Sequence, residues 1–253
     1  MNIKSTRDAF IHYQKSPAGR IRYQQAISNL EAMHNLSKEL KVLDAAGGNG
    51  LITEYLLKNN HKVTLYDSDP QMLAEAKARI RPKRLLDRCK MVKGSLDCLG
   101  EKFPQSSFDL ILCHHVLEYT GDVFGILKSM FDLTIPGGTL SLITINPVSE
   151  VIRAVLFQHD SKLAQSKLND LSYDARWFGK ATLYNRNQLE TWAQNAGWAF
   201  CDFRGIRILA DYIPETELDD AKEKDLLYLE NTLANLDPYR HFGRYIQFSF
   251  KRI

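Results

Sequence analysis

A glycine-rich segment, Asp44 to Gly50, carries the residues best suited to bind a nucleotide-like ligand. A short apolar run, Lys41-Val42-Leu43, precedes it, and apolar residues at three- and four-residue spacing follow it from Leu51 to Leu57. This order predicts a strand, a glycine turn and a helix. Glycines at such a turn let the backbone approach a ligand at positions where any Cβ would collide with it.

Two ligands fit a turn of this kind. A dinucleotide fingerprint reads G-x-G-x-x-G and holds a pyrophosphate at the helix N-terminus. Here the pattern is D-x-A-x-G-x-G, with Asp44 at the end of the strand. It favours S-adenosylmethionine, which has no phosphate and has an α-ammonium group that needs a carboxylate or carbonyls nearby. A turn that merely connects a strand to a helix is the remaining alternative.

A second acid ends the next predicted strand, residues 61–67. Asp67 lies seventeen residues beyond Gly50, about where a strand-end carboxylate accepts hydrogen bonds from two ribose hydroxyls. The alternative is that Asp67 only caps the loop that follows. The segment Gly94-Ser95-Leu96-Asp97, after a short strand at 90–93, is expected to border the adenine.

Strands and helices alternate up to about residue 146, which predicts a parallel, doubly wound sheet. The further elements expected there are a helix at 71–80, a strand at 108–113, a helix from Val123 to Met130, a tight turn at 135–138 and a strand at 139–145. Beyond them the pattern predicts a helix at 151–157, a polar stretch to 185, a helix at 187–196, a long bent strand at 198–211, a surface helix at 215–236 and a strand at 244–252. The two late strands indicate an antiparallel edge.

We therefore expect a Rossmann-like α/β fold of about seven strands, mostly parallel with an antiparallel edge strand, in a single domain over residues 1–253. Residues 1–40 are expected to be a helical segment that either covers the ligand site as a lid or packs on the sheet edge. Three parts follow it: a cofactor-binding half at 41–146, an inserted helical cap on the substrate side at 147–185 and a substrate-binding half at 186–253.

Composition narrows the class of protein. The 253 residues are 44% hydrophobic and 25% charged, which is typical of a globular protein. The first nine residues are polar and charged, and no apolar run reaches the roughly 20 residues needed to cross a bilayer, so we expect a cytoplasmic protein without a membrane partner. The four cysteines are scattered without C-x-x-C pairs, which predicts reduced thiols and no metal site. The oligomeric state is left open.

The net charge of +3 permits a nucleic-acid partner without requiring one. Seven basic residues lie between Arg79 and Lys93 against one acid, Asp87. This run falls between the second helix and the third strand, away from the carboxyl ends of the strands, where ligands bind in open parallel sheets. We therefore interpret it as a solvated surface.

In their order and spacing these segments resemble the class I S-adenosylmethionine-dependent methyltransferases. The matching motifs are Val42 to Gly50, Asp67, Gly94-Ser95, Asp109 to Glu118 and Pro136-Gly137-Gly138. Ala46 departs from the usual first glycine of the turn, and we expect its methyl group to tighten the turn without abolishing binding.

A closer resemblance is to the bacterial tRNA 5-carboxymethoxyuridine methyltransferases, which esterify the carboxylate of the modified wobble uridine. The pieces that carry it are Gly19-Arg20-Ile21-Arg22, Leu110 to His114 with Val116-Leu117-Glu118, Pro136-Gly137-Gly138, Ala196-Gly197-Trp198, Gly205-Ile206-Arg207 with Asp211-Tyr212, and Phe242 to Ile246. Residues 158–185 fit poorly, because the lysine-rich run of the family is missing there.

The resemblance implies a set of cofactor contacts. Arg22 would pair with the methionine carboxylate, and His114 would lie near the transferring methyl group. Its neighbour His115 has no counterpart and is expected to be structural. With the strand-end acid of the glycine turn included, the predicted S-adenosylmethionine residues are Arg22, Asp44, Gly47, Gly48, Asp67, Ser95, Leu96 and His114.

A carboxylate acceptor needs no general base, because it is already ionised at neutral pH with a reference pKa of about 4. It needs cations or hydroxyls that hold its oxygens, and the candidates are Arg207, Tyr212, Arg244 and Tyr245. The alternative is that Arg207 pairs with Asp202 or Asp211 and that Arg244 is solvated at a strand end. The segment Cys113-His114-His115-Val116 stands where amine methyltransferases often have Asn/Asp-Pro-Pro-Tyr, so amine methylation is disfavoured.

A tRNA partner is expected to meet basic residues of the N-terminal segment and residues 176–186. The N-terminal candidates are Lys4, Arg7, Lys15 and Arg20. Two other functions stay open: methylation of a carboxyl or hydroxyl oxygen on a small molecule, and binding of S-adenosylmethionine without activity.

Overall fold

The computed structural model describes residues 3–175 and 179–253, with side chains from Asp8 onward. Its α-helices are α1 (Ile3–Gln14), α2 (Pro17–Met33), α3 (Leu51–Lys58), α4 (Pro70–Ile80), α5 (Leu99–Lys102), α6 (Val123–Leu133), α7 (Pro147–Gln158), α8 (Ser161–Ser166), α9 (Arg186–Asn195) and α10 (Asp220–Leu233). Its strands are β1 (Lys41–Ala45), β2 (Lys62–Asp67), β3 (Cys89–Lys93), β4 (Phe108–His114), β5 (Thr134–Ile145), β6 (Ser172–Ala175), β7 (Gly179–Thr182), β8 (Trp198–Ile206) and β9 (Tyr245–Arg252).

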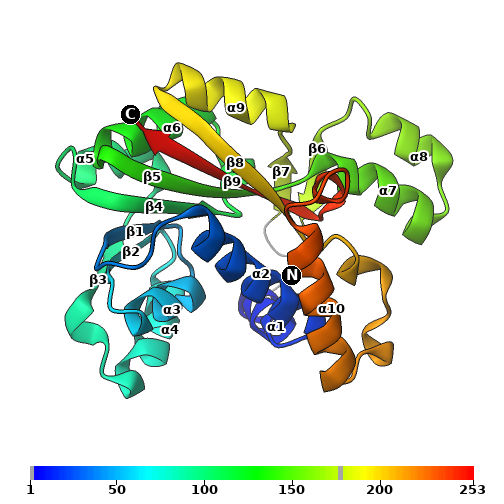
Figure 1. Ribbon diagram of the computed structural model, residues 1–253, viewed down its shortest axis with the longest axis horizontal. Coiled ribbons are helices and arrows are strands. Elements are labelled where there is room, and N and C mark those ends of the chain that lie inside the picture. Colours follow the sequence, from blue (N-terminus) through cyan, green and yellow to red (C-terminus); the bar gives the residue numbers. More distant parts are fainter. Residues whose placement is uncertain (1–2, 176–178) are drawn as a thin grey trace. The chain divides into compact units, whose positions relative to one another are not determined.

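Seven of these strands form one sheet in the order β3-β2-β1-β4-β5-β9-β8 (Figure 1). The pairs β2–β3, β1–β2, β1–β4 and β4–β5 are parallel. Strands β9 and β8 end the order and give the sheet its antiparallel edge. The predicted Rossmann-like fold of about seven mostly parallel strands is therefore confirmed. Strands β6 and β7 form a separate antiparallel pair.

By its contacts the chain divides into two compact units, each built from three segments. Unit 1 comprises Met1–Leu30, Thr144–Arg186 and Phe203–Gln247, and unit 2 comprises Glu31–Ile143, Asn187–Asp202 and Phe248–Ile253. The single domain with its four parts, as expected from the sequence, stays a prediction.

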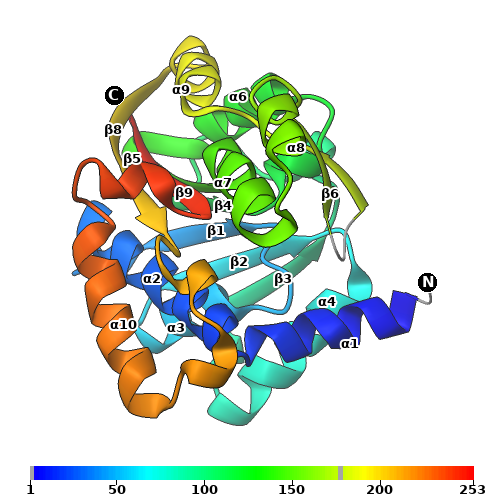
Figure 2. The same cartoon turned by 90° about the vertical axis from the view of Figure 1, so that its right-hand side faces the viewer.

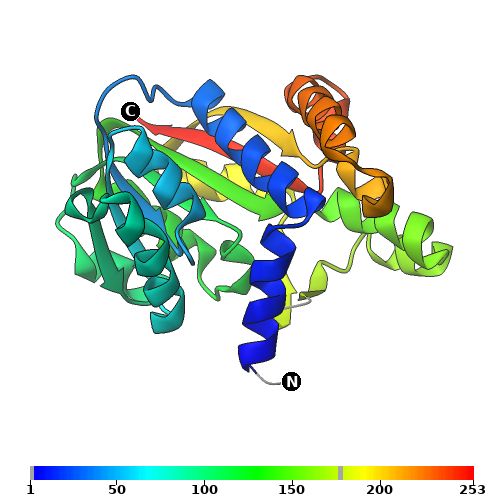
Figure 3. The same ribbon diagram turned by 90° about the horizontal axis from the view of Figure 1, so that it is seen from below.

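In unit 2, the central strands are buried along their length because helices cover both faces. Helices α3 and α4 pack on one face, and α6 and α9 lie on the other (Figures 1 and 3). Four consecutive β4 residues, Leu110 to Cys113, are fully buried. Continuous apolar runs of this kind are typical of parallel strands buried on two sides.

In unit 1, α2 and α10 lie side by side (Figure 2). Ile21 of α2, Leu226 of α10 and Ala210 form a buried apolar cluster between them. Arg20 and Glu223 form an ion pair at the edge of the same contact. The surface helix predicted at 215–236 is shorter in the structure, because α10 begins at Asp220 and ends at Leu233.

The structure corrects two predicted strands. The turn expected at 135–138 lies inside β5, where Gly137 has φ 81° and the register with β4 shifts between Phe108 and Leu110. The long strand expected at 198–211 ends at Ile206, because Arg207 adopts a left-handed φ of 56°. The next three backbone N–H groups donate to Glu230 and so cannot pair with a strand.

The polar stretch to residue 185 also has more structure than its sequence pattern indicates. It contains α8 and the β6–β7 pair. Among the residues that the structure describes, no helix is long and apolar enough to cross a membrane. In the same part of the chain, no group of three or more His, Cys, Asp or Glu side chains could hold a metal ion.

Candidate active site

The glycine turn of unit 2 is built over the carboxyl group of Asp44. This group is buried and accepts a hydrogen bond of 2.6 Å from Thr53 Oγ1. Burial raises the pKa of Asp44 to about 6. A Cβ at Gly47 would lie 2.6 Å from the Asp44 carboxyl, so only glycine lets the turn pack this closely. The buried carboxyl group of Asp44 therefore packs directly against the turn and stabilises it.

Asp67, at the end of β2, joins two loops at the carboxyl edge of the sheet. Its Oδ2 accepts a hydrogen bond of 2.8 Å from the Gly48 N–H, and its Oδ1 accepts one of 2.8 Å from the Asp69 N–H. Burial raises its pKa. Because each carboxylate oxygen can accept two hydrogen bonds, Asp67 keeps capacity for the hydroxyls of a ligand.

A cavity of about 240 Å³ opens beside Asp67 in unit 2. Of the predicted cofactor residues, Asp67, Ser95 and Leu96 line this cavity, whereas Asp44, Gly47, Gly48 and His114 do not. The remaining lining residues are Ala46, Tyr66, Ser68, Gly94, Asp97, Val116, Tyr119, Thr120 and Gly121.

The wall of the cavity formed by Gly94 and Ser95 is fixed by Tyr66. The Tyr66 hydroxyl donates a hydrogen bond of 2.7 Å to the Ser95 carbonyl. A Cβ at Gly94 would lie 2.1 Å from that hydroxyl oxygen, so Gly94 is the residue that admits this contact. The cavity lies at the carboxyl ends of parallel strands, where ligands bind in open α/β sheets.

His114 ends β4 as a neutral imidazole. Its Nε2 lies 3.0 Å from Ser141 Oγ on β5. Burial, with a smaller contribution from nearby His34, lowers the pKa of His114 to about 3. A ring with so low a pKa is a poor general base at neutral pH. The adjacent His115 has φ 58° and donates its N–H to the Ile143 carbonyl at 2.8 Å.

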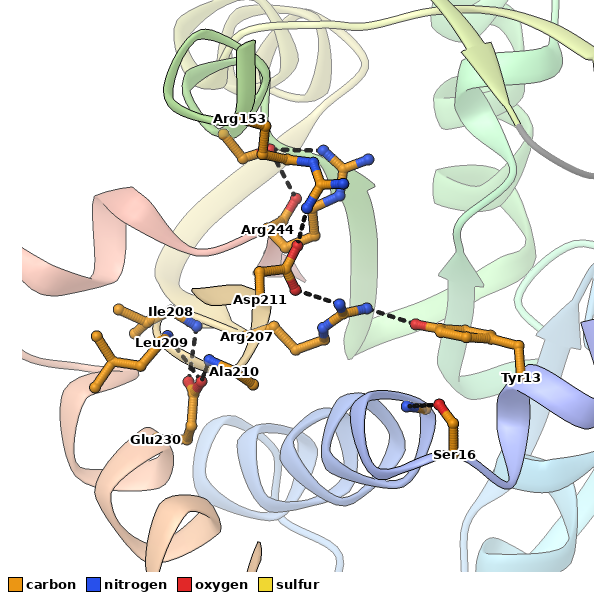
Figure 4. Close-up of polar contacts among 12 residues, drawn as sticks. Tyr13, Ser16, Arg153, Arg207, Ile208, Leu209, Ala210, Asp211, Glu230 and Arg244 are labelled. Carbon is orange, nitrogen blue, oxygen red and sulfur yellow. Dashed lines mark hydrogen bonds and ion pairs between the residues drawn. The ribbon is translucent and has the colours of Figure 1, made fainter. Parts of the chain in front are cut away.

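Unit 1 contains a cluster of buried arginines, of which Arg207 is the centre (Figure 4). Arg207 forms an ion pair with Asp211 and donates to the Tyr13 hydroxyl. Asp211 also pairs with Arg153 of α7, so one carboxylate bridges two guanidinium groups. The alternative pairing of Arg207 with Asp211 is thus present in the structure.

Arg244 belongs to the same cluster and is buried, not solvated at a strand end. It pairs with Glu150 and donates hydrogen bonds of 2.9 Å to Ser149 Oγ and the Tyr173 hydroxyl. Tyr245 follows it directly as the first residue of β9. Burial raises the pKa of Tyr245, but Arg22, Arg207 and Arg244 outweigh this and lower it overall.

Arg22 differs from the other three arginines because rings surround it. Only 5% of Arg22 is exposed, and its guanidinium carbon lies 4.7 Å from the ring centroid of Tyr23, 5.1 Å from that of Tyr13 and 5.7 Å from that of Tyr245. No carboxylate of the described residues forms an ion pair with it, and its Nε is buried without a hydrogen-bond partner. A buried cation of this kind is suited to receive an anion.

Tyr212, the fourth acceptor candidate, lies next to Asp211 in the short helix η5 (Ala210–Tyr212). Its ring stacks on that of Phe157, at the end of α7. The structure therefore brings Arg207, Arg244 and Tyr245 into one buried cluster and places Tyr212 beside it, more exposed.

The chain is similar to known methyltransferases in sequence and in fold. Residues 43–142 match the model of a methyltransferase domain. A tRNA 5-carboxymethoxyuridine methyltransferase from Escherichia coli (strain K12) is 28% identical over 221 residues, which cover 85% of this chain and 81% of the relative. An S-adenosylmethionine-dependent methyltransferase structure from Mesorhizobium loti aligns with a TM-score of 0.63 at 17% identity, covering 90% of this chain and 98% of that one.

The chain is an S-adenosylmethionine-dependent methyltransferase. A further structural neighbour is the 1,6-didemethyltoxoflavin-N1-methyltransferase from Burkholderia thailandensis with bound S-adenosylhomocysteine, at a TM-score of 0.59 and 17% identity, covering 99% of this chain and 84% of that one. The cavity of this methyltransferase combines the half-buried carboxylate of Asp67 with a wall that contains Gly94. Asp67, Ser95 and Leu96, which line it, stay predicted cofactor residues.

Sequence reasoning missed several residues of both sites. In the cavity of the methyltransferase these include Tyr66 and the segment Tyr119 to Gly121. In the arginine cluster they are Tyr13, Glu150, Arg153 and Tyr173, which come from distant parts of the chain. Of these residues, only Tyr66 could have been found from a local pattern, because it directly precedes the acid at the end of its strand.

The basic residues expected to contact tRNA are only partly described. Arg20 is paired with Glu223, and Lys15 uses its carbonyl to accept a hydrogen bond from Arg20. Arg176 and the side chains of Lys4 and Arg7 lie outside the described residues. In the basic run of unit 2, three side chains bind neighbouring groups of the same unit: Arg79 donates to the Asn49 carbonyl, Lys83 pairs with Glu54 and Arg88 donates to the Asn60 carbonyl.

Proposed function

We propose that this methyltransferase esterifies the carboxylate of 5-carboxymethoxyuridine at the wobble position of tRNA. The observation that carries the proposal is the buried arginine cluster of unit 1. The name of the Escherichia coli relative gives this activity, and its alignment with this chain covers most of both proteins. A tRNA substrate would also place the enzyme in the cytoplasm, as the sequence predicts.

The charge of the cluster supports an anionic acceptor. The cluster has four guanidinium groups, of Arg22, Arg153, Arg207 and Arg244, and two carboxylates, Glu150 and Asp211, which pair with the last three of them. Its net charge is therefore +2, and Arg22 alone of the four has no carboxylate partner among the described residues. Buried charges are stable only when they are paired, so a cluster of this composition suits two monoanions. The carboxylate of the methyl donor, which the resemblance assigns to Arg22, and the carboxylate of the acceptor meet this requirement.

The reaction needs alignment more than acid–base chemistry. S-adenosylmethionine supplies an electrophilic methyl group when it is bound. The acceptor carboxylate forms a bond from one oxygen to the methyl carbon while the carbon–sulfur bond breaks and its electron pair goes to sulfur. No proton has to be removed, in agreement with the low pKa of His114. Arg207 and Arg244 would hold the acceptor oxygens in line.

The test uses tRNA from a strain that lacks the terminal wobble-uridine methyl ester. The purified enzyme is incubated with this tRNA and S-adenosylmethionine labelled in its methyl group, and the nucleosides are separated by mass spectrometry. We expect the label in a methyl ester of 5-carboxymethoxyuridine that mild alkali removes. The matched control is tRNA whose wobble uridine is unmodified, which should take up no label.

Two results would contradict the proposal. Label that appears only on added small carboxylic acids or alcohols would favour the small-molecule O-methyltransferase. Binding of S-adenosylmethionine without transfer to any acceptor would indicate a relative that has lost its activity. If the wild type does methylate the tRNA, we expect Arg207→Lys and Arg244→Lys each to reduce the rate strongly, and unchanged rates would show that the cluster does not hold the acceptor.

A further inference from the structure

A stacked pair of aromatic rings, of the exposed Phe157 and the half-buried Tyr212, adjoins the arginine cluster of unit 1. The rings of Phe157 and Tyr212 are stacked, with planes 7° apart and centroids 6.0 Å apart. Phe157 is 46% exposed although it is large and apolar. The guanidinium carbon of Arg153 lies 5.0 Å from the Phe157 ring centroid.

The pair is connected to the cluster through its own residues. Arg153 pairs with Asp211, and Asp211 precedes Tyr212 in the chain and pairs with Arg207 (Figure 4). The charges of Arg153 and Asp211 also act on the Tyr212 hydroxyl, whose pKa burial raises. A flat apolar surface therefore borders directly on a cationic one.

An exposed aromatic ring beside guanidinium groups is suited to bind a nucleotide. Unpaired nucleobases bind by stacking on exposed aromatic rings, often with an arginine beside them, while basic groups hold the anionic part of the nucleotide. The other exposed apolar residues of α7, Val148, Val155 and Leu156, are aliphatic and offer no ring for this purpose. A cation over the ring is suited to a partner that is both aromatic and anionic.

We propose that Phe157, Tyr212 and Arg153 form a stacking platform for an unpaired nucleobase of the acceptor RNA. The proposal rests on the function proposed above, and it adds the residues that distinguish a nucleotide in an RNA loop from a simple carboxylic acid. The arginine cluster binds the carboxylate, and the platform binds a base of the same single-stranded segment.

The test compares four proteins in steady-state methylation of tRNA that lacks the wobble methyl ester. They are the wild type, Phe157→Leu, Phe157→Trp and the control Leu156→Ala. Leucine keeps the apolar bulk of Phe157 but has no ring, whereas tryptophan keeps a ring. Leu156 is the neighbouring residue, is exposed and carries no ring of its own.

For Phe157→Leu we expect the KM for tRNA to rise by roughly 5- to 140-fold, the range set by loss of one base–aromatic contact. Its kcat should stay within about twofold and its Kd for S-adenosylhomocysteine should not change, because the change is confined to RNA binding. Phe157→Trp should keep the wild-type KM within a few-fold, and Leu156→Ala should match the wild type.

The outcomes separate this proposal from the one on which it rests. If the wild type methylates the tRNA and Phe157→Leu has the same KM as Leu156→Ala, the platform is overturned and the proposed function stands. A KM that rises equally in the leucine and tryptophan variants would also overturn it, since the ring would then not matter. If the wild type fails to methylate the tRNA, both proposals fall.

Discussion

Replacement of Arg22 by methionine tests whether its buried guanidinium receives the carboxylate of the methyl donor. The guanidinium is almost entirely buried and has no carboxylate partner among the described residues. A hydrogen bond to a charged group contributes about 1.5–3 kcal/mol, so the loss of two such bonds costs about 3–6 kcal/mol. We therefore expect Arg22→Met to raise the Kd of S-adenosylhomocysteine by at least roughly 100-fold.

The measurement is titration calorimetry with two ligands, S-adenosylhomocysteine and 5′-methylthioadenosine. The second ligand keeps the nucleoside but lacks the amino-acid carboxylate, so its Kd should change by no more than about threefold. We expect the unliganded variant to unfold at the same temperature as the wild type or higher, because it loses a buried cation that lacks a carboxylate partner. An equal rise in the Kd of both ligands, or an unchanged Kd for S-adenosylhomocysteine, would refute the reasoning.

Three further changes test other parts of the structure. Asp67→Asn should raise the Kd of 5′-methylthioadenosine by roughly 10-fold or more, since the amide nitrogen cannot accept hydrogen bonds; calorimetry would show an unchanged Kd if Asp67 only capped its loop. Burial lowers the pKa of His34 to about 4, so the wild type should lose stability as the pH falls from about 6.5 to 4. When urea unfolding is measured at pH 7 and at pH 5, the free energy of unfolding of His34→Gln should fall between the two by about 2 kcal/mol less than that of the wild type. An equal fall in both proteins would contradict this. Glu230 accepts three backbone N–H groups at 2.7–2.8 Å, so Glu230→Gln should lower the free energy of unfolding by about 1–3 kcal/mol; full stability in urea would show that these contacts are weak.

Much of unit 2 can be predicted from the sequence because its signals are local. The strand, glycine turn and helix from Lys41 to Lys58 follow one another without interruption, and Asp67 ends the next strand. Strands β2, β3 and β4 start or end within one residue of the predicted bounds. Their apolar runs are clear because helices cover both faces, and this burial is what a sequence pattern reports best.

One detail of the glycine turn could not be anticipated in full. Ala46, expected only to tighten the turn, has φ 61°, in the region that glycine enters freely. An L-residue there costs about 1–2 kcal/mol, and the Ala46 N–H recovers part of this by donating a hydrogen bond of 2.7 Å to the Tyr66 carbonyl. The sequence marks the position as unusual, but only the structure shows its backbone.

The arginine cluster of unit 1 is harder to predict because its members are far apart in the chain. Tyr13 comes from α1, Arg153 from α7 and Tyr173 from β6, and none belongs to a recognisable motif. These residues come together around the segment that begins at Arg207. The left-handed backbone of Arg207 ends β8, and the contacts to Glu230 follow it. A long apolar segment such as 198–211 conceals this turn, since its side chains alternate as in a strand.

The two acids of the cluster indicate what kind of acceptor it suits. Guanidinium groups alone would hold a carboxylate so strongly that its oxygens would lose nucleophilicity. Asp211 is shared by Arg153 and Arg207, and Glu150 pairs with Arg244, so these three cations present about one net positive charge. At the same time the acids fix the direction of each guanidinium, which preserves alignment. On the function proposed above, a monoanionic carboxylate would thus be oriented without being neutralised, whereas a phosphate dianion would leave a buried negative charge in excess.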